Sequence, residues 1–373
     1  MPNLKSLIHF LPELILFAGS ILILLLALFN AKRISFVLSM VFLAVAGLFS
    51  LFQFNIGNPP LFWGLILVDK MAVFFKLLFI VTAFLIAIFA NESREIEDDK
   101  PEFYSLLLAS VVGMNLLSQA NHLLIIYLGL EFVSLISYLL VGYVKGSKRS
   151  SEAGIKYLLF GAVASGFFLY GASIFYGQAG SLYLADFVKL TPHGFNIIAG
   201  ILILAGFLYK IAAVPMQAWC PDAYEGAPIP VASFLSVAPK AAGFAILIRI
   251  IDFIGVNFNW QLVIAVISAA TMTFGNLAAI PQNNLKRLLA YSSIAHAGYL
   301  LIGVATFTPK GIEAVYFYFI AYLLMNLGTF LVVQIIEGKF GSEEIETYRG
   351  LGRKGAACII LGIIMTVFLL SLT

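Results

Sequence analysis

The sequence has little charge, little cysteine and little histidine. Of its 373 residues, 11% are Asp, Glu, Lys or Arg, whereas a soluble globular domain has about 25%. So few polar side chains cannot cover a water-facing surface, which excludes a soluble enzyme. Cys220 and Cys358 are far apart, and the four histidines form no pair at ligand spacing. The chain therefore lacks the ligands for a disulfide framework, a zinc site, a haem or an iron–sulfur cluster, and we expect it to carry no cofactor or metal.

What the sequence has instead is long apolar runs. Hydrophobic residues make up 61% of the chain, and the net charge of +3 comes from scattered basic residues that form no nucleic-acid-binding patch. A spanning helix needs about 20 mostly apolar residues. Runs of this kind lie near 11–29, 34–54, 71–90, 103–120, 122–143, 157–177, 195–214, 229–251, 261–280, 288–305, 312–336 and 356–373. They predict an all-α polytopic membrane protein with about twelve transmembrane helices.

The positions of the basic residues predict an orientation. The turns after every second run, beginning with the first, hold 14 of the 22 Lys and Arg residues. Positive residues collect on the cytoplasmic side of a membrane. We therefore expect a multi-pass protein of a bacterial inner membrane with its N-terminus outside.

Some ionisable residues remain at membrane depth after the loops are assigned. A charge at the centre of a helix costs about 2.5–3.5 kcal/mol on insertion scales, so such residues are functional candidates. Glu131, Lys210 and Lys240 lie deep in their runs, too deep for the lysines to reach the interface easily. Lys76 is about one turn inside its run, and Glu13 is expected to be an interfacial anchor. The alternative interpretation of these residues is a structural ion pair or a snorkelling lysine.

Prolines gather around two of these lysines. The residues concerned are Pro215, Pro221, Pro228, Pro230 and Pro239. Proline removes a backbone donor and interrupts a helix. Interrupted helices at membrane depth occur where they line a protein-walled or wet cavity, as in the ion sites of transporters. We therefore expect broken helices at Lys210 and Lys240, and a proton relay in which each lysine responds to an acidic partner.

The run at 288–305 carries a second polar stripe. Ser292, His296 and Tyr299 are spaced i, i+4 and i+7, so they share one helix face. Such a face could pass protons through hydroxyls and an imidazole. It could equally be a hydrogen-bonded packing face between helices.

Several segments resemble a known family. They are LPELILFAGSILILLLALF, YLGLEFVSLISYLLVGY, EAGIKYLLFGAVASGFFLYG, KIAAVPMQAWCPDAYEGAPIPVASFLSVAPKAAGFA and NNLKRLLAYSSIAHAGYLLIG. Together they are similar to the N-type, antiporter-like chains of the proton-pumping NADH–quinone oxidoreductase, respiratory complex I. The resemblance implies two inverted five-helix repeats with discontinuous helices in a single transmembrane domain, 1–373. Three helices would lead, 103–251 would form the first repeat, and 261–373 would form an incomplete second repeat.

The resemblance also implies roles for individual residues. Glu131 matches the family's helix 5 glutamate, Lys210 the helix 7 lysine that pairs with it, and Lys240 the helix 8 lysine that passes the proton on. Lys286 and Lys156 match the lysines that open helices 10 and 6. NADH, FMN, the iron–sulfur clusters and quinone would belong to other subunits. The partners would be the other membrane subunits of the complex and, indirectly, its hydrophilic arm.

The sequence departs from the family at two places. Gln217 stands where the family often has histidine. The second broken helix, with its lysine, is expected to begin just after Thr373, so the C-terminal part of the second repeat would be missing. Two other functions stay open: a subunit of a sodium/proton antiporter or membrane-bound hydrogenase of the same superfamily, and a scaffold bundle whose lysines are structural.

Overall fold

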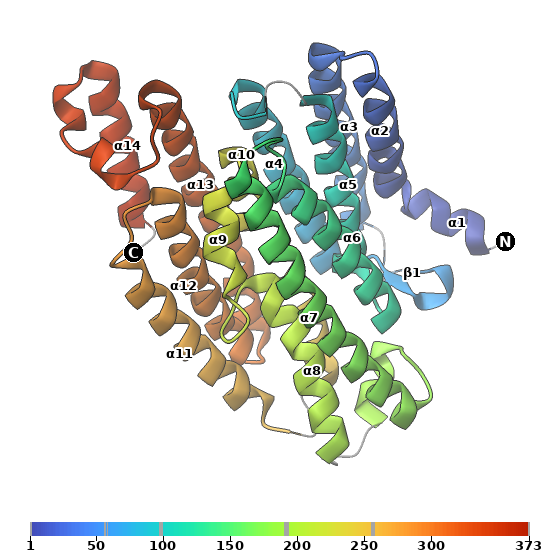
Figure 1. Cartoon of the computed structure of the whole chain (residues 1–373). Helices are drawn as coiled ribbons and strands as arrows, with labels where there is room; N and C mark the ends of the chain where they lie inside the picture. The colour runs from blue at the N-terminus through green and yellow to red at the C-terminus, as the bar shows by residue number, and fades with distance from the viewer. Residues whose placement is uncertain are drawn as a thin grey trace.

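The computed structural model of the chain describes residues 2–55, 57, 59–96, 100–189, 194–254 and 258–371. Within them the chain is a bundle of α-helices with one small hairpin (Figure 1). The first half contains α1 Pro2–His9, α2 Leu11–Ala27, α3 Lys32–Phe52, α4 Lys70–Glu92, α5 Lys100–Gln119, α6 Leu123–Val141 and α7 Lys148–Ala179. The second half contains α8 Gly194–Ile211, α9 Trp219–Gly226, α10 Ile229–Ile254, α11 Trp260–Ala279, α12 Leu285–Ala305, α13 Pro309–Phe340 and α14 Ala356–Ser371.

Short elements connect some of these helices. The 3₁₀ helices are η1 Gln53–Asn55, η2 Phe62–Gly64, η3 Leu184–Lys189, η4 Ile345–Tyr348 and η5 Leu351–Arg353. Strands β1 Pro60–Leu61 and β2 Ile66–Leu67 pair antiparallel. The hairpin lies between α3 and α4, beside α1 in Figure 1.

Each of the twelve predicted runs coincides with a helix, which confirms an all-helical polytopic membrane protein. Within the described residues, nine helices have the length and composition to cross a membrane. Helices α2 and α14 are apolar but shorter, at 17 and 16 residues. Twelve spans and a repeat architecture therefore stay predictions.

Helix α10 forms the centre of the bundle. Its apolar stretch Ile229–Ile251 is buried along its whole length, whereas 22% of the corresponding stretch of α11 is buried. Helices α4, α5, α8 and α13 pack around α10. An apolar helix buried on all sides belongs to the core of a membrane bundle.

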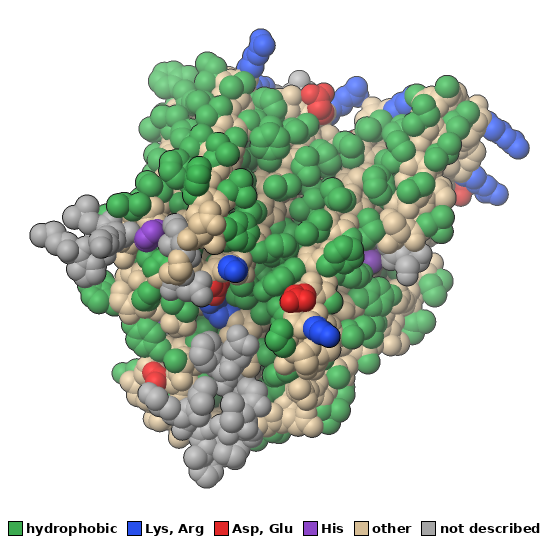
Figure 2. Space-filling model, turned by 180° about the vertical axis from the view of Figure 1, so that it is seen from behind, with side chains coloured by type: hydrophobic (Ala, Val, Ile, Leu, Met, Phe, Trp, Pro, Cys, Tyr) green, Lys and Arg blue, Asp and Glu red, His purple; other side chains and the backbone are tan. Residues whose placement is uncertain are grey.

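The outer surface is apolar. Figure 2 shows one face covered mainly by hydrophobic side chains, with Lys and Arg gathered along its upper edge and a few charges in the middle. Leu128, Leu139 and Val163 are examples of large exposed side chains on α6 and α7. Exposed apolar surface of this extent is expected where helices face lipid.

Polar residues fix the ends of several helices. Ser147 caps α7 by accepting a hydrogen bond from the Ser150 amide, and Thr308 caps α13 in the same way. Asp69 accepts from the amide of Ala72 at the start of α4 and forms an ion pair with Arg249 of α10, with 2.8 Å between Oδ2 and Nη1. These contacts set where the helices begin and how α4 meets the central helix.

Candidate functional site

Helix α8 is interrupted directly after Lys210. It ends at Ile211, Ala212 has a φ of +57°, and the next helix begins at Trp219. At the break the Tyr209 carbonyl accepts both from the Ala212 amide, over 3.1 Å, and from the Trp219 indole, over 3.0 Å. The predicted interruption beside this lysine is therefore present, and its backbone is satisfied inside the protein.

The predicted break at Lys240 is wrong. Helix α10 continues through Pro239 from Ile229 to Ile254. Proline costs a helix one hydrogen bond, and a fully buried helix can tolerate this where its neighbours hold the backbone in place. Lys240 therefore projects from an intact helix and is 3% exposed.

Glu131 and Lys210 are each hydrogen-bonded to a serine and form no direct ion pair. Lys210 is 1% exposed and donates to the Ser134 hydroxyl over 3.1 Å, whereas half-buried Glu131 accepts from the Ser165 hydroxyl. The negative charge of Glu131 still stabilises the Lys210 ammonium electrostatically. Both serines and Lys210 line a cavity of about 10 Å³, close to the minimum volume for one water molecule.

Lys210 also lies against the central helix. A methyl group at Gly243 would be 3.4 Å from Cβ and Cγ of Lys210 and 2.6 Å from Cγ2 of Ile211. Gly243 follows Lys240 by three residues, so both lie on one face of α10. The absence of a side chain at Gly243 lets α8 bring Lys210 to the face that carries Lys240.

Lys240 bonds to α12. Its Nζ is 2.7 Å from the Ser293 hydroxyl and 2.9 Å from the Ser293 carbonyl oxygen. His296 lies one turn further along α12, and its Nδ1 is 2.5 Å from the hydroxyl oxygen of Tyr318 on α13. Separate hydrogen-bonded pairs of polar groups thus follow one another from α7 and α6 through α8, α10 and α12 to α13. We call this arrangement the polar line; between α8 and α10 it is joined by packing at Gly243 and not by a hydrogen bond.

Of the predicted stripe Ser292, His296 and Tyr299 on α12, one residue belongs to the polar line. His296 is 3% exposed and belongs to it. Ser292 is half-buried, and the hydroxyl of Tyr299 accepts instead from Asn276 on α11 over 3.0 Å. Ser293, which the periodicity argument passed over, contacts Lys240.

Lys156 belongs to a charged cluster at the N-terminal end of α7. This charged cluster consists of Arg149, Glu152, Lys156, Asp222, Glu225 and Arg287. Lys156 is 3.0 Å from Asp222 and its side chain is 43% exposed. Burial raises the pKa of Asp222, but hydrogen bonds from Lys156 and Arg287 outweigh burial, so the pKa is lowered. The charges therefore hold Asp222 ionised.

Lys286 lies beside this cluster but is buried. Its Nζ is 2.5 Å from Glu343 and donates to the Ala227 carbonyl over 2.7 Å. Ala227 is the C-cap of α9 and lies two residues before α10, so Lys286 ties α12 to the turn that leads into the central helix. Nearby Glu95 accepts from the Ile229 amide over 2.8 Å. Glu95 is half-buried and joins the turn after α4 to the start of the central helix.

The expectation that Glu13 is an interfacial anchor is wrong. Glu13 is 1% and Lys76 is 0% exposed, and their charged atoms are 2.8 Å apart. Gln53 accepts from Lys76 and Gln119 donates to Glu13, each over 2.9 Å. Glu13 is therefore a buried partner of Lys76 and no interfacial anchor. Its distance from the helix end gave no information about its neighbours.

Sequence reasoning missed the hydroxyl groups and the glycine of the polar line. Ser134, Ser165, Ser293 and Gly243 carry no charge and are common in membrane helices, so nothing marked them. One signal was available for Ser134, because it follows Glu131 by three residues on the same helix.

Gln217, which stands where the family often has histidine, lies in the loop after α8 with its Oε1 unpaired. Within the described part of the chain, His, Cys, Asp and Glu form no group that could hold a metal ion.

Comparisons with known proteins place these helices in a family. The family described as "NADH:quinone oxidoreductase/Mrp antiporter, TM" matches residues 120–373. A relative from Chloroherpeton thalassium, NADH-quinone oxidoreductase subunit N 2, is 40% identical over 98% of this chain and 75% of its own length. A second relative with the same name, from Sorangium cellulosum, is 40% identical over 100% of this chain and 79% of its own length.

A solved structure agrees with these relatives. A chain of "Respiratory complex I from Thermus thermophilus with bound Aureothin" is 33% identical, with a TM-score of 0.80 over 97% of this chain and 78% of that chain. The similarity therefore extends from sequence to the arrangement of the helices. It confirms the resemblance drawn from the sequence segments.

Proposed function

The chain belongs to the NADH:quinone oxidoreductase/Mrp antiporter family, and we propose that it is a membrane-arm subunit of the N type in NADH:quinone oxidoreductase. In this role it translocates protons while other subunits carry electrons from NADH to quinone. It sits among other membrane-arm subunits and holds no redox centre. The observation that carries the proposal is the buried Lys210, which donates to a hydroxyl rather than a carboxylate, lies beside a small cavity and is stabilised by the charge of Glu131.

The proposed relay uses the polar line in order. Glu131 takes up a proton from outside the pair, and Lys210 then passes its own proton to a neutral Lys240 across the face of α10 that carries Gly243. Glu131 returns its proton to Lys210 through the two serines or one water in the cavity that these serines line. A charge moved into this dry interior is unfavourable unless a partner compensates it. When Glu131 is protonated, the Lys210 ammonium loses its compensating charge, which favours passing its proton to Lys240.

The remaining residues have secondary places in this proposal. His296 continues the line beyond Lys240 through Ser293. Lys156 and Lys286 lie at the charged end of the bundle, in ion pairs with Asp222 and Glu343, and are secondary candidates. Lys76, a candidate from the sequence, forms a direct buried pair with Glu13 and has no part in the proposed relay.

The topology proposed with this function follows the sequence. Residues 103–251 form a first repeat and 261–373 part of a second, inverted one, with three helices leading. The N-terminus is outside and the charged loops face the cytoplasm of a bacterium, because they hold most of the Lys and Arg residues. NADH, FMN, iron–sulfur clusters and quinone are bound elsewhere in the assembly.

The test is to replace Lys210 in the intact complex. Lys210→Met removes the charge, and Lys210→Arg keeps the charge but cannot release a proton at physiological pH. We expect both to assemble and to lower NADH-driven proton pumping by about 100-fold or more, within the usual range for loss of an acid–base group. The control is Lys310→Met, which removes an exposed lysine at the start of α13.

Four outcomes would contradict the proposal. Normal pumping in Lys210→Met would remove Lys210 from the relay. Normal pumping in Lys210→Arg would mean that a fixed charge suffices. Loss of assembly in both, with intact Lys310→Met, would indicate a structural lysine. Sodium transport in vesicles that is lost when the chain is deleted, while NADH oxidation stays normal, would favour an antiporter.

A further inference from the structure

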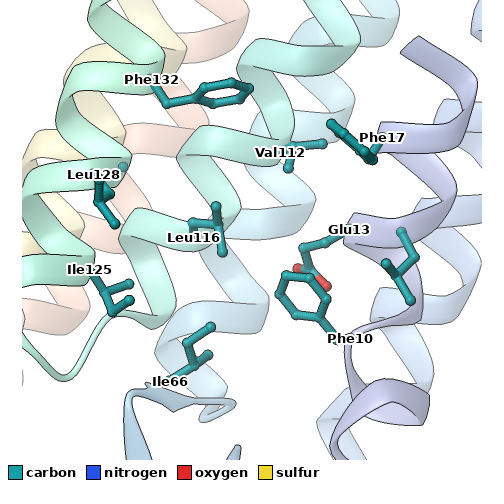
Figure 3. A pocket seen from close by; sticks show the side chains of 11 residues that line it. Phe10, Glu13, Phe17, Ile66, Val112, Leu116, Ile125, Leu128 and Phe132 are labelled. Carbon is teal, nitrogen blue, oxygen red and sulfur yellow. The ribbon is translucent and has the colours of Figure 1, made fainter. Parts of the chain in front are cut away.

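A pocket separate from the polar line opens on the outer surface of the bundle. It has a volume of about 410 Å³ and lies between α2, α5 and α6, with strand β2 at one end. Figure 3 shows Val112 and Leu116 of α5 at its back and Phe17 and Leu128 on opposite sides. Phe17 and Leu128 are 48% and 53% exposed, so the pocket opens where the helices face lipid.

One lining residue is ionisable. All the others are apolar or glycine, and the exception is Glu13 of α2, which is 1% exposed. In Figure 3 its side chain extends from α2 towards α5. Oε1 accepts from Lys76 and Gln119, whereas Oε2 is buried and has no hydrogen-bond partner. A buried carboxylate oxygen without a donor is unfavourable, so this site favours a ligand that supplies one.

The charges around Glu13 restrict the ligand further. Lys76 already neutralises Glu13 at 2.8 Å. A cationic or anionic ligand would bring an additional uncompensated charge into a dry, apolar pocket. A hydroxyl group adds no charge and makes a strong, charge-assisted hydrogen bond to a carboxylate.

We propose that this pocket binds an uncharged amphiphile of the bilayer, an apolar chain or ring system that ends in a hydroxyl group. The hydroxyl donates to Oε2 of Glu13, and the apolar part lies along Leu116, Ile125 and Leu128 towards the mouth. The volume is in the range of pockets that hold small ligands. This site is independent of the proposed proton relay.

The test compares two probes that differ only in the donor. Membranes containing the intact complex are irradiated with a long-chain alcohol that carries a diazirine, or with the methyl ether of the same probe. We expect the alcohol to label peptides of α2 and α6 about tenfold more than the ether, as loss of a hydrogen bond to a charged group predicts.

Two variants locate the site. Leu128→Trp fills the mouth of the pocket and is expected to abolish labelling by the alcohol. Leu139→Trp is the control, because Leu139 lies on the same helix about three turns further on, is 59% exposed and does not line the pocket. Both positions are exposed, so both variants should fold.

Glu13→Gln tests the acceptor. It removes the carboxylate, so the alcohol should lose its advantage over the ether. If Glu13→Gln does not fold, the two tryptophan variants still decide the question.

Several results would overturn the proposal. Equal labelling by alcohol and ether would mean that Glu13 selects nothing. Stronger labelling by an ammonium probe of the same chain would contradict an uncharged ligand. Equal labelling of Leu128→Trp and wild type would place the label elsewhere. A crosslink from this pocket to another subunit would make it a subunit contact.

Discussion

Two acid–base pairs inside the bundle are built in different ways. Glu13 and Lys76 touch at 2.8 Å, both side chains are 0% exposed, and glutamines complete their contacts. Glu131 and Lys210 bind serine hydroxyls instead, and both serines line a cavity of about 10 Å³ beside Lys210. The first pair joins α2 to α4. The lysine of the second pair lies at the end of α8, where that helix is interrupted.

The difference shows how the same residue types can serve stability or transfer. A direct, fully bonded pair has one favourable arrangement, and removal of either partner leaves an unpaired charge in the interior. A pair separated by hydroxyls has more than one arrangement of protons with similar energy. The contact geometry therefore separates a structural pair from a candidate for proton transfer, which the residue types alone do not.

The largest effect is expected from breaking the direct pair. Lys76→Met leaves Glu13 buried and unpaired, which should destabilise the protein by about 3–5 kcal/mol. We expect little assembled complex, measured by size-exclusion chromatography of detergent extracts. The double variant Glu13→Leu with Lys76→Met should recover much of it. Normal assembly of Lys76→Met without pumping would instead make Lys76 a relay residue and end the comparison.

A large effect on transfer alone is expected at Gly243. In Gly243→Ala the new methyl group would be 2.6 Å from Ile211 Cγ2, which forces the end of α8 and Lys210 away from α10. Misplacement of a reacting group by about 1 Å can cost about 100-fold in rate. We expect the rate of proton pumping to fall by up to about 100-fold while the complex still assembles. Gly166→Ala, where the methyl group meets open space, should pump normally. Equal pumping in both variants would contradict the proposed approach of Lys210 to α10.

A smaller effect is expected from the hydroxyl beside Lys210. Ser134→Ala removes the hydrogen-bond acceptor at 3.1 Å from Nζ, and a bond to a charged group is worth about 1.5–3 kcal/mol. We expect proton pumping to fall about tenfold, with the thermal midpoint of unfolding less affected than in Lys76→Met. The control is Ser173→Ala, an exposed serine on α7 that bonds only its own helix. An unchanged rate in Ser134→Ala would show that the cavity alone supports transfer.

The smallest effect concerns pH and the charged cluster. The folded pKa of Asp222 is lowered, so its contribution to stability is present above the ordinary pKa of about 4 and is lost as the pH falls through the folded value. We expect thermal stability to fall in this acid range, and to fall less in Asp222→Asn. Glu346→Gln, at an exposed pair with Arg349, should behave like wild type. Identical acid profiles for all three proteins would exclude Asp222 from this role.

Some of the site could be predicted from the sequence, because placing a charge inside a membrane helix is energetically unfavourable. Glu131, Lys210 and Lys240 stood out because charges in apolar runs are too unfavourable to occur without a partner. Ser134 and Ser293 did not stand out, because a hydroxyl in a membrane helix costs little and can bond its own backbone. Pro239 suggested a break that α10 does not have, because burial on all sides outweighs a missing hydrogen bond.

The sequence by itself determined the helices, their membrane character and the depth of each charge. Hydropathy and helix periodicity are local properties, so a window of about 20 residues contains them. Only the tertiary structure decided which acid meets which base. Glu13 contacts a lysine 63 positions away on α4, whereas Lys210 meets serines and a glycine. Such pairings depend on how helices pack, and packing is a property of the whole bundle that no single run of residues holds.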